Sequence, residues 1–370
     1  MSFGLDNLPY GSVVDLSGRR FAAVRFEDDV LDLGTLAPDV FAGGTLDRFL
    51  AAGPKMWSEV RAAAADALRA GREPLVSLRD VRPVPSFAVA DYVDFYASEH
   101  HATNAGRIFR PDGEPLPPSW RHQPIGYYGR AAALQVSDTD VFRPSGNMRV
   151  GDEVRFGPCA RLDFEAELAF VIGVASERCR QISVTAADRH VFGVCLLNDW
   201  SARDIQAFEA TPLGPFLGKS FATSIAAWIT PLAALQDARV GRQQDPLPAA
   251  HLRESVDPHG LAIDLEIAVN GTVLSRPSFA DMYWSYAQML AHLTSNGAAV
   301  QTGDVFASGT VSGPRPDQRG CLLELTWNGS EPVTLADGTT RAWLQDGDEV
   351  SIAASAGAVS LGEVRARVLT

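Results

Sequence analysis

The chain has 370 residues, 46% of them apolar and 21% charged, so we expect a globular protein of two domains, or one large domain with an appendage. Its 45 acidic and 32 basic residues give a formal net charge of −13, which disfavours general binding to nucleic acid or to an anionic membrane. An anionic ligand would therefore need a local cluster of cationic side chains.

The cysteine pattern and the N-terminus bear on the cellular compartment. The four cysteines are scattered without a C-x-x-C pair, which disfavours a thiolate zinc site and a disulfide framework. The first residues lack the basic start and apolar stretch of a secretory signal, and the apolar run 225–235 is short and contains Pro231. We therefore expect a cytoplasmic protein without a membrane span.

The N-terminal region predicts a small β structure followed by a helix. Residues 12–36 alternate short apolar runs with turn residues, as a β-meander does. A helix is predicted from about residue 54 to residue 70, because Pro54 suits the first helical position and Gly71 the C-terminal stop. No phosphate-binding glycine motif occurs there, so we interpret this region as structural.

The rest of the chain predicts a mainly β protein with some α-helix, of the α+β class. Residues 79–85 contain two prolines and predict a linker, which divides the chain into domains 1–85 and 86–370. From residue 87 onward short apolar segments are separated by Gly and Pro, and Asn270-Gly271 predicts a β-hairpin.

One segment carries three alternating carboxylates. Asp163, Glu165 and Glu167 alternate with apolar residues, and at strand spacing they would share one face about 7 Å apart. Asp264 and Glu266 show the same alternation beside the predicted hairpin. Because both segments cannot be presumed to be sites, the pattern by itself favours a solvated acidic face over a cation site.

Polar side chains also concentrate where a predicted strand meets a predicted helix. The apolar run 191–197 is followed by a helix predicted from Ser201, with Asp204 placed as in a capping box. The residues gathered here are Asp199, Arg203, Gln206 and, on a glycine–proline loop, Lys219. Their density favours a functional site over solvated surface charges.

Two further positions are candidates for acid–base chemistry. His100 and His101 are neighbours, and the pattern does not choose between them; a lone histidine is more often a structural hydrogen-bonding group than a base. Glu324 lies in an otherwise apolar stretch, so it is either buried with a partner or part of a site. The small residues of 303–314 would let backbone approach a ligand closely.

Taken together, these segments resemble the fumarylacetoacetase (fumarylacetoacetate hydrolase) family. The matching strings occur in order over most of the chain, at residues 91–96, 101–104, 126–130, 162–167, 198–206, 212–220, 307–314 and 346–349. The resemblance implies a small SH3-like β-barrel domain at 1–85 and a larger mixed β-roll catalytic domain at 86–370.

The resemblance also assigns roles, position by position. It implies a hard divalent cation, Ca²⁺ or Mg²⁺, with the ligands Asp94, Glu165, Glu167 and Asp199. A second, structural cation would involve Asp199, Lys219 and Thr223. Of the two histidines it selects His101 as the catalytic one, with Glu324 as its carboxylate partner. Groups that stabilise an oxyanion would be Arg203, Gln206 and Lys219. Substrate contacts would be Tyr96, Arg110, Tyr127, Gln206 and Thr310.

The implied activity is hydrolysis of a carbon–carbon bond in fumarylacetoacetate, giving fumarate and acetoacetate, the last step of tyrosine breakdown. Water activated by His101 would attack, and the family suggests a homodimer. One departure is Ala210, where the family has a tyrosine that contacts substrate, which bears on specificity. The alternatives are a relative acting on another acylpyruvate or oxo-acid, and a non-catalytic metal-binding scaffold.

Overall fold

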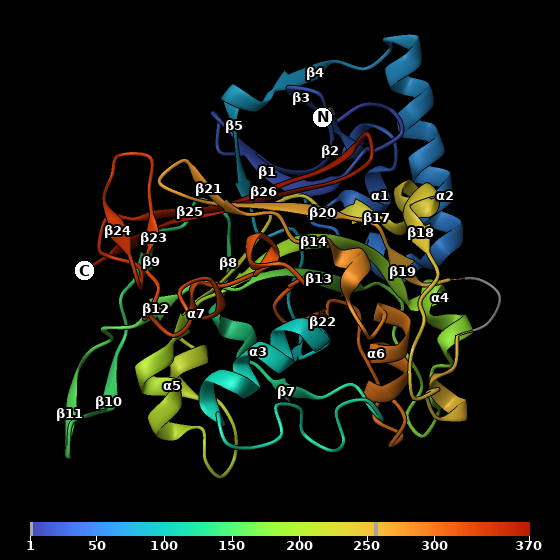
Figure 1. Ribbon diagram of the computed structural model, residues 1–370. Coiled ribbons are helices and arrows are strands. Elements are labelled where there is room, and N and C mark those ends of the chain that lie inside the picture. The colour runs from blue at the N-terminus through green and yellow to red at the C-terminus, as the bar shows by residue number, and fades with distance from the viewer. Residues whose placement is uncertain (1–2, 255–257) are drawn as a thin grey trace.

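The computed structural model describes residues 3–254 and 258–370. Its N-terminal part is an antiparallel sheet with strand order β4-β3-β2-β1-β5, which lies beside a long helix (Figure 1). The strands are β1 (Tyr10–Asp15), β2 (Arg20–Phe26), β3 (Asp29–Asp32), β4 (Leu75–Ser77) and β5 (Val81–Val84). The helices are α1 (Pro38–Phe41) and α2 (Asp47–Ala70). The predicted meander is therefore confirmed.

Helix α2 begins seven residues before the predicted start and is kinked. Gly53 has a φ of 82°, which breaks the helical path and makes Pro54 the first residue of the straight segment, the position that proline favours. Gly71 ends the helix with a φ of 58°, in the left-handed conformation that suits glycine. The helix and its stop are confirmed, and only its first turns were missed.

The prediction of a linker at residues 79–85 is wrong in structural terms. Residues 81–84 form β5, which pairs antiparallel with β1 and lies at the edge of the N-terminal sheet. An edge strand can carry Pro83 because its outward side needs no backbone N–H donor. The two prolines therefore indicated a sheet edge. The division of the chain into domains at residue 85 stays a prediction.

The larger part contains two mixed sheets that pack against each other through β14, β25 and β26. The first runs β7 (Gly126–Tyr128), β6 (Tyr92–Phe95), β22 (Val305–Ala307), β13 (Ala166–Ile172), β14 (Val191–Asp199), β16 (Thr223–Ile225) and β8 (Leu134–Val136), and β17 (Thr230–Pro231) also pairs with β14. The second runs β21 (Thr272–Ser275), β20 (Asp264–Val269), β25 (Glu349–Ala356), β26 (Val359–Leu369) and β9 (Val141–Phe142). The mainly β, α+β architecture is confirmed.

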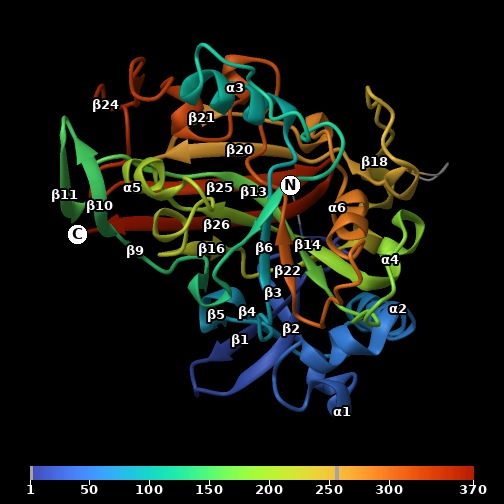
Figure 2. The same ribbon diagram turned by 90° about the horizontal axis from the view of Figure 1, so that it is seen from below.

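Short helices and paired strands complete this part. The helices are α3 (Glu99–Phe109), α4 (Ala187–His190), α5 (Arg203–Glu209), α6 (Tyr286–Leu293) and α7 (Leu322–Leu325). The strand pairs are β10 (Ser145–Val150) with β11 (Glu153–Pro158), β12 (Leu162–Asp163) with β15 (Ser201–Ala202), β18 (Arg239–Val240) with β19 (Gly260–Leu261), and β23 (Val333–Thr334) with β24 (Thr340–Arg341). Figures 1 and 2 show α3 and α5 on the side of β13 and β14 that faces away from the N-terminal sheet.

A continuous core joins the N-terminal sheet to the larger part. Tyr10 of β1 stacks on Phe49 of α2 with ring centroids 5.1 Å apart, and its ring meets the edge of Phe192 of β14 at 5.3 Å. Tyr10 also forms a β-bridge with Ile229. Such fully buried rings contribute much of the apolar stabilisation of a fold, so the two parts stabilise each other.

The hairpin that served as a comparison for the acidic segment is confirmed. Asn270 and Gly271 have φ angles of 49° and 73° and connect β20 to β21. Asp264 and Glu266 of β20 are exposed, and Glu266 pairs with Arg276 at the surface. This alternation does form a solvated acidic face.

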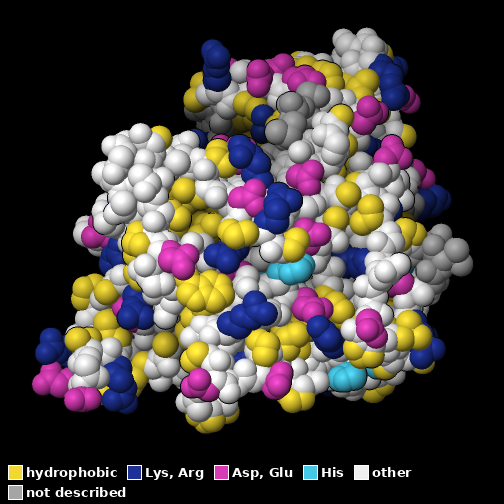
Figure 3. Space-filling view, viewed as in Figure 1, with side chains coloured by type: hydrophobic (Ala, Val, Ile, Leu, Met, Phe, Trp, Pro, Cys, Tyr) yellow, Lys and Arg dark blue, Asp and Glu magenta, His cyan; other side chains and the backbone are white. Residues whose placement is uncertain are grey.

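Charged and apolar side chains are mixed on the molecular surface. On the face in Figure 3, acidic, basic and apolar side chains are interspersed. Within residues 3–254 and 258–370, no helix is both long enough and apolar enough to cross a membrane.

Candidate active site

Strand register brings the candidate metal ligands together at one end of the first sheet. Asp94 of β6 stands opposite Ala307 of β22, and β22 pairs in turn with β13. The backbone N–H of Asp199, at the end of β14, donates to the carbonyl of Glu165 at 3.1 Å. Four carboxylates from three different strand ends therefore face one point.

The four carboxylates form a compact, buried cluster. Asp94, Glu165, Glu167 and Asp199 each place an oxygen within 4.8 Å of the others. None of the four is more than 5% exposed. The solvated-face interpretation of the acidic alternation is therefore wrong for this segment. Helices and loops cover this face, and the alternation of residue types along a strand does not reveal that cover.

Two of these carboxylates, Asp94 and Glu167, form no ion pair with any cationic side chain in the part of the chain that the structure describes. Within the described residues, Asp94 Oδ1 and Glu167 Oε1 are buried with no hydrogen-bond partner, while Glu167 Oε2 accepts the Gly309 N–H at 3.0 Å. Burial, and then the Asp199 charge, raise the pKa of Asp94 well above its ordinary value. Burial, and then Asp94, do the same to the pKa of Glu167. Both groups are costly as anions unless a cation joins them.

Lys219 forms ion pairs with the other two carboxylates and offsets part of their charge. Its Nζ lies 2.5 Å from Glu165 Oε2 and 2.5 Å from Asp199 Oδ2, and the side chain is buried. Burial alone would raise the pKa of Glu165, but Lys219 and Arg203 hold it below its ordinary value. Burial likewise opposes the lysine charge, yet Asp199 and Glu165 raise the pKa of Lys219. The glycine–proline loop therefore presents its lysine to the interior.

The cluster fits a hard divalent cation. All four candidate ligands offer carboxylate oxygens, the donors that Ca²⁺ and Mg²⁺ prefer. Lys219 compensates part of their charge, and the unpartnered oxygens of Asp94 and Glu167 point to a further positive charge. The structure supports a divalent metal site at this cluster on the chemistry of its donors.

His101 and Glu324 form a buried pair beside the cluster. His101 Nδ1 lies 2.6 Å from Glu324 Oε2, and Ser98 caps α3 by accepting the His101 N–H at 3.2 Å. Burial would raise the pKa of Glu324, but His101 and further hydrogen bonds lower it to about 2. Glu324 is therefore an ionised acceptor that orients the imidazole, which confirms that this residue is buried with a partner.

Arg203 joins the carboxylate cluster to the rest of the site. Its Nη2 lies 2.7 Å from Glu165 Oε1 and 2.9 Å from Asp163 Oδ2. Its Nη1 donates to Gln206 Oε1 at 3.2 Å, as expected for two residues on one helical face. Of the oxyanion-stabilising groups that the resemblance assigned, Arg203 and Lys219 thus contact Glu165, and Gln206 contacts Arg203.

The predicted capping box is wrong. Helix α5 begins at Arg203, and Ser201 belongs to β15, where it pairs with Asp163. Asp204 accepts the Ala160 N–H at 2.7 Å instead of capping the helix. The chain stays extended through Ser201 because β12 provides backbone partners, which the local sequence does not reveal.

The predicted substrate contacts fall into an inner and an outer group. Tyr96 packs edge-on against His101 with ring centroids 5.2 Å apart, and Tyr127 donates to Asp199 Oδ2 at 3.0 Å. Thr310 is 1% exposed and its Oγ1 has no partner among the described residues. Arg110 is exposed at the end of α3 and donates to the Pro115 carbonyl at 2.7 Å. It therefore lies at the rim.

The residues predicted for a second cation form a hydrogen-bonded set. Lys219 bonds Asp199 Oδ2, and Thr223 Oγ1 donates to Asp199 Oδ1 at 3.5 Å. The oxygens of Asp199 thus already accept protein donors. A second cation at this point stays a prediction.

Sequence reasoning missed four residues that hold these groups in place. Asp163 accepts the N–H groups of Leu322 and Leu323 at the start of α7, besides Arg203. The others surround Glu324, and they are Asn104, Ser312 and Cys321. Asp163 was visible as the first member of the acidic alternation, and Asn104 as the third residue after His101. Ser312 lies within the matched string 307–314, but neither Ser312 nor Cys321 was assigned a role.

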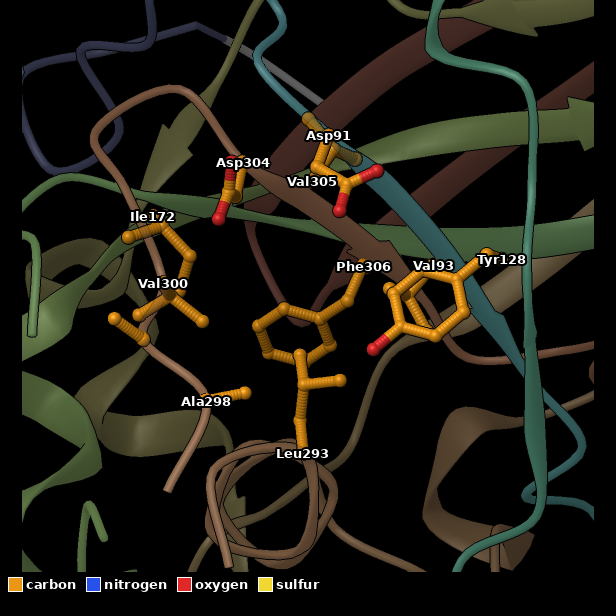
Figure 4. Close-up of a pocket in the computed structure, with 11 residues that line it drawn as sticks. Asp91, Val93, Tyr128, Ile172, Leu293, Ala298, Val300, Asp304, Val305 and Phe306 are labelled. Atoms are coloured by element: carbon orange, nitrogen blue, oxygen red, sulfur yellow. The ribbon is translucent and has the colours of Figure 1, made fainter. Parts of the chain in front are cut away.

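A separate small pocket lies next to β6 and β22, and it is not this site (Figure 4). Val93 and Phe306 contribute to its lining, with Asp91, Asp304 and Leu293. Val93 precedes Asp94 in β6, and successive strand residues point to opposite faces. The pocket therefore lies across the sheet from the carboxylate cluster, and its lining contains no histidine or cation.

Comparison with known proteins places this site in a family. Residues 6–91 match the family described as fumarylacetoacetase N-terminal, and residues 91–369 match fumarylacetoacetate (FAA) hydrolase C-terminal. A fumarylacetoacetase from Bos taurus is 42% identical over 382 residues, covering 94% of this chain and 90% of the relative. One from Homo sapiens is 38% identical over 383 residues, covering 95% of this chain and 91% of the relative.

Solved structures show the same fold at greater distance. A fumarylacetoacetate hydrolase from Exiguobacterium antarcticum has a TM-score of 0.62 at 18% identity, covering 98% of this chain and 99% of that chain. A maleylpyruvate hydrolase from Sphingobium has a TM-score of 0.56 at 18% identity, covering 97% of this chain and 99% of that chain. From the two family matches and the identities with its relatives, this chain belongs to the fumarylacetoacetate hydrolase family.

Proposed function

We propose that this chain is a fumarylacetoacetase, a hydrolase that cleaves fumarylacetoacetate to fumarate and acetoacetate in tyrosine breakdown. The observation that carries the proposal is the convergence of four buried carboxylates beside the His101–Glu324 pair. It is supported by relatives of that name that match more than nine tenths of the chain. An ionised carboxylate buried against an imidazole favours an enzyme over a scaffold without activity.

His101 is the general base of the proposed reaction. With Nδ1 bound to Glu324 Oε2 at 2.6 Å, the imidazole presents Nε2 as its free acceptor. Nε2 takes a proton from water, and the resulting hydroxide attacks the carbonyl carbon next to the fumaryl group. Glu324 stabilises the imidazolium that forms, because it remains an anion at this buried position.

Arg203, Gln206 and Lys219 stabilise the oxyanion that develops on the attacked carbonyl. The two cations are buried and held by carboxylates, so they are oriented before substrate arrives. Such preorganised charges cost little reorganisation at the transition state. The carbon–carbon bond then breaks, the electron pair passes to the acetoacetate fragment as an enolate, and a proton restores the ketone.

Asp94, Glu165, Glu167 and Asp199 would hold a divalent cation, Ca²⁺ or Mg²⁺, at the end of the sheet. When bound, the cation would supply Lewis-acid polarisation of the substrate. A second cation near Asp199, Lys219 and Thr223 is part of the same proposal. Tyr96, Tyr127 and Thr310 line the interior, and Arg110 at the rim would attract the substrate carboxylate against the acidic background of the protein.

Fumarate release from fumarylacetoacetate, measured with purified protein before and after chelation, tests this function. We expect turnover that a chelator abolishes and added Ca²⁺ or Mg²⁺ restores. Maleylpyruvate and other acylpyruvates serve as competing substrates, since one solved structure of this fold is a maleylpyruvate hydrolase. A preference for an acylpyruvate would replace the proposed substrate, and absence of turnover on all of them would support the scaffold alternative.

We also propose a cytoplasmic homodimer. The β10–β11 hairpin packs beside α5 and projects from the molecule (Figure 1). Large apolar side chains are exposed on it and on the loop after α5, namely Val150, Val154, Phe156, Leu213 and Phe216. Exposed apolar groups of this kind mark protein interfaces. Light scattering should give the dimer mass, and Phe156→Ser should lower it; a monomeric wild-type protein would contradict the proposal.

A further inference from the structure

The two carboxylate oxygens of Glu324 differ in the number of their partners. Oε2 is approached by His101 Nδ1 at 2.6 Å, Ser312 Oγ at 2.7 Å and Cys321 Sγ at 3.3 Å. Oε1 accepts one hydrogen bond within the described residues, from Asn104 Nδ2 at 2.9 Å. Asn104 therefore restrains Oε1, and together with the partners of Oε2 it restrains the rotation of the carboxylate about its last side-chain bond.

Asn104 comes from the same helix as the base. It follows His101 by three residues in α3, so the two side chains lie on one helical face and reach across to α7 together. An ionised carboxylate only accepts hydrogen bonds, which fixes the asparagine with its amide nitrogen toward Glu324. One rigid element thus supplies the imidazole and the group that orients the imidazole's partner.

We propose that Asn104 is a positioning residue for catalysis, acting on His101 through Glu324. By fixing Oε1, the Asn104 amide sets the plane of the carboxylate and hence the direction in which Oε2 meets His101 Nδ1. That contact determines where Nε2 points and which nitrogen carries the proton. The kinetic part of this inference rests on the proposed function.

A purely structural role is the competing explanation, since the Asn104–Glu324 bond also ties α3 to α7. The two explanations predict different results when Asn104 and Glu324 are changed together. If the bond is only a structural tie, its loss should lower the free energy of unfolding. It should also lower activity by the same factor whether or not residue 324 is charged. A positioning residue would lose its effect once the Glu324 charge is gone, because the two changes then act on one interaction.

The kinetic test is a double-mutant cycle of Asn104→Ala with Glu324→Gln, with Thr103→Ala on the same helix as control. In the wild-type background we expect kcat to fall about tenfold or more with KM nearly unchanged, as for loss of a hydrogen bond to a charged group. In the Glu324→Gln background the further fall should be under about threefold. Equal losses in both backgrounds, or a matching loss in Thr103→Ala, would overturn the proposal.

A spectroscopic test does not depend on turnover. The short contact between His101 Nδ1 and Glu324 Oε2 should give a downfield proton resonance that is absent in His101→Ala. We expect Asn104→Ala and the equally sized Asn104→Asp to shift or broaden this resonance while thermal unfolding shows a folded protein. An unchanged resonance in both folded variants would refute positioning by Asn104. Its loss in a protein without fumarylacetoacetase activity would uphold the inference while refuting the function.

Discussion

His101 Nδ1 lies 2.6 Å from Glu324 Oε2, although 223 positions separate the two residues in the chain. The contact joins α3 to α7 and is buried on both sides. Burial alone would raise the pKa of Glu324, but His101, with hydrogen bonds from Asn104 and Ser312, keeps this carboxylate charged. The behaviour of the site therefore depends on the pair, and neither residue can be interpreted alone.

His101→Ala should abolish turnover while leaving cation binding intact. Removing a general base costs on the order of 10²–10⁴ in rate, whereas the four carboxylates keep their positions. Fumarate release and calorimetric titration with Ca²⁺ measure the two effects. His100→Ala is the matched control and should retain most activity; normal turnover in His101→Ala would eliminate the proposed base.

Asp94→Asn should stabilise the cation-free protein and weaken cation binding. Burial and then Asp199 raise the pKa of Asp94, so its ionised form destabilises the fold at neutral pH when no cation is bound. A raised pKa also means that the cation-free wild type loses stability as pH rises through that value. Melting curves in chelator should move upward for the variant, while its Ca²⁺ Kd weakens at least about 100-fold. A lower melting temperature in chelator would contradict this account.

Glu324→Gln should make the free energy of unfolding depend less on pH in the acidic range. The pKa of Glu324 falls from its ordinary 4.5 to about 2, so its contribution is present above about pH 4.5 and is lost as pH falls toward 2. That contribution is about 3 kcal/mol at neutral pH. Urea unfolding of both proteins from about pH 3 to 7 should show a difference that shrinks on acidification; a pH-independent difference would argue against a charged Glu324.

Arg203→Lys should be far from conservative. The guanidinium spans Asp163, Glu165 and Gln206 at once, and a lysine ammonium cannot reach all three. We expect kcat to fall about 100-fold and stability to fall by about 3 kcal/mol, since a buried ion pair is broken. Arg276→Lys in the exposed pair with Glu266 is the control, and it should change stability little. Similar losses of stability in Arg203→Lys and Arg276→Lys would refute the importance of the buried contacts of Arg203.

Much of the architecture could be predicted from the chain because its signals are local. The meander, the stop at Gly71 and the hairpin at Asn270-Gly271 depend on a few neighbouring residues with restricted backbone angles. The capping box at Ser201 and the linker at residues 79–85 failed for the opposite reason. In both places pairing with a distant strand, β12 or β1, overrode the local preference.

The sequence by itself determined which residues could do chemistry here, and the motif strings assigned them to a family. It could not distinguish the acidic alternation at Asp163–Glu167 from the one at Asp264–Glu266, because a strand pattern is the same whether water or protein covers it. Tertiary structure decided that difference by burying the first against α7 and Lys219 while leaving the second in solvent. Burial turns like charges into a cost that a cation must offset, and burial is a property of the whole fold.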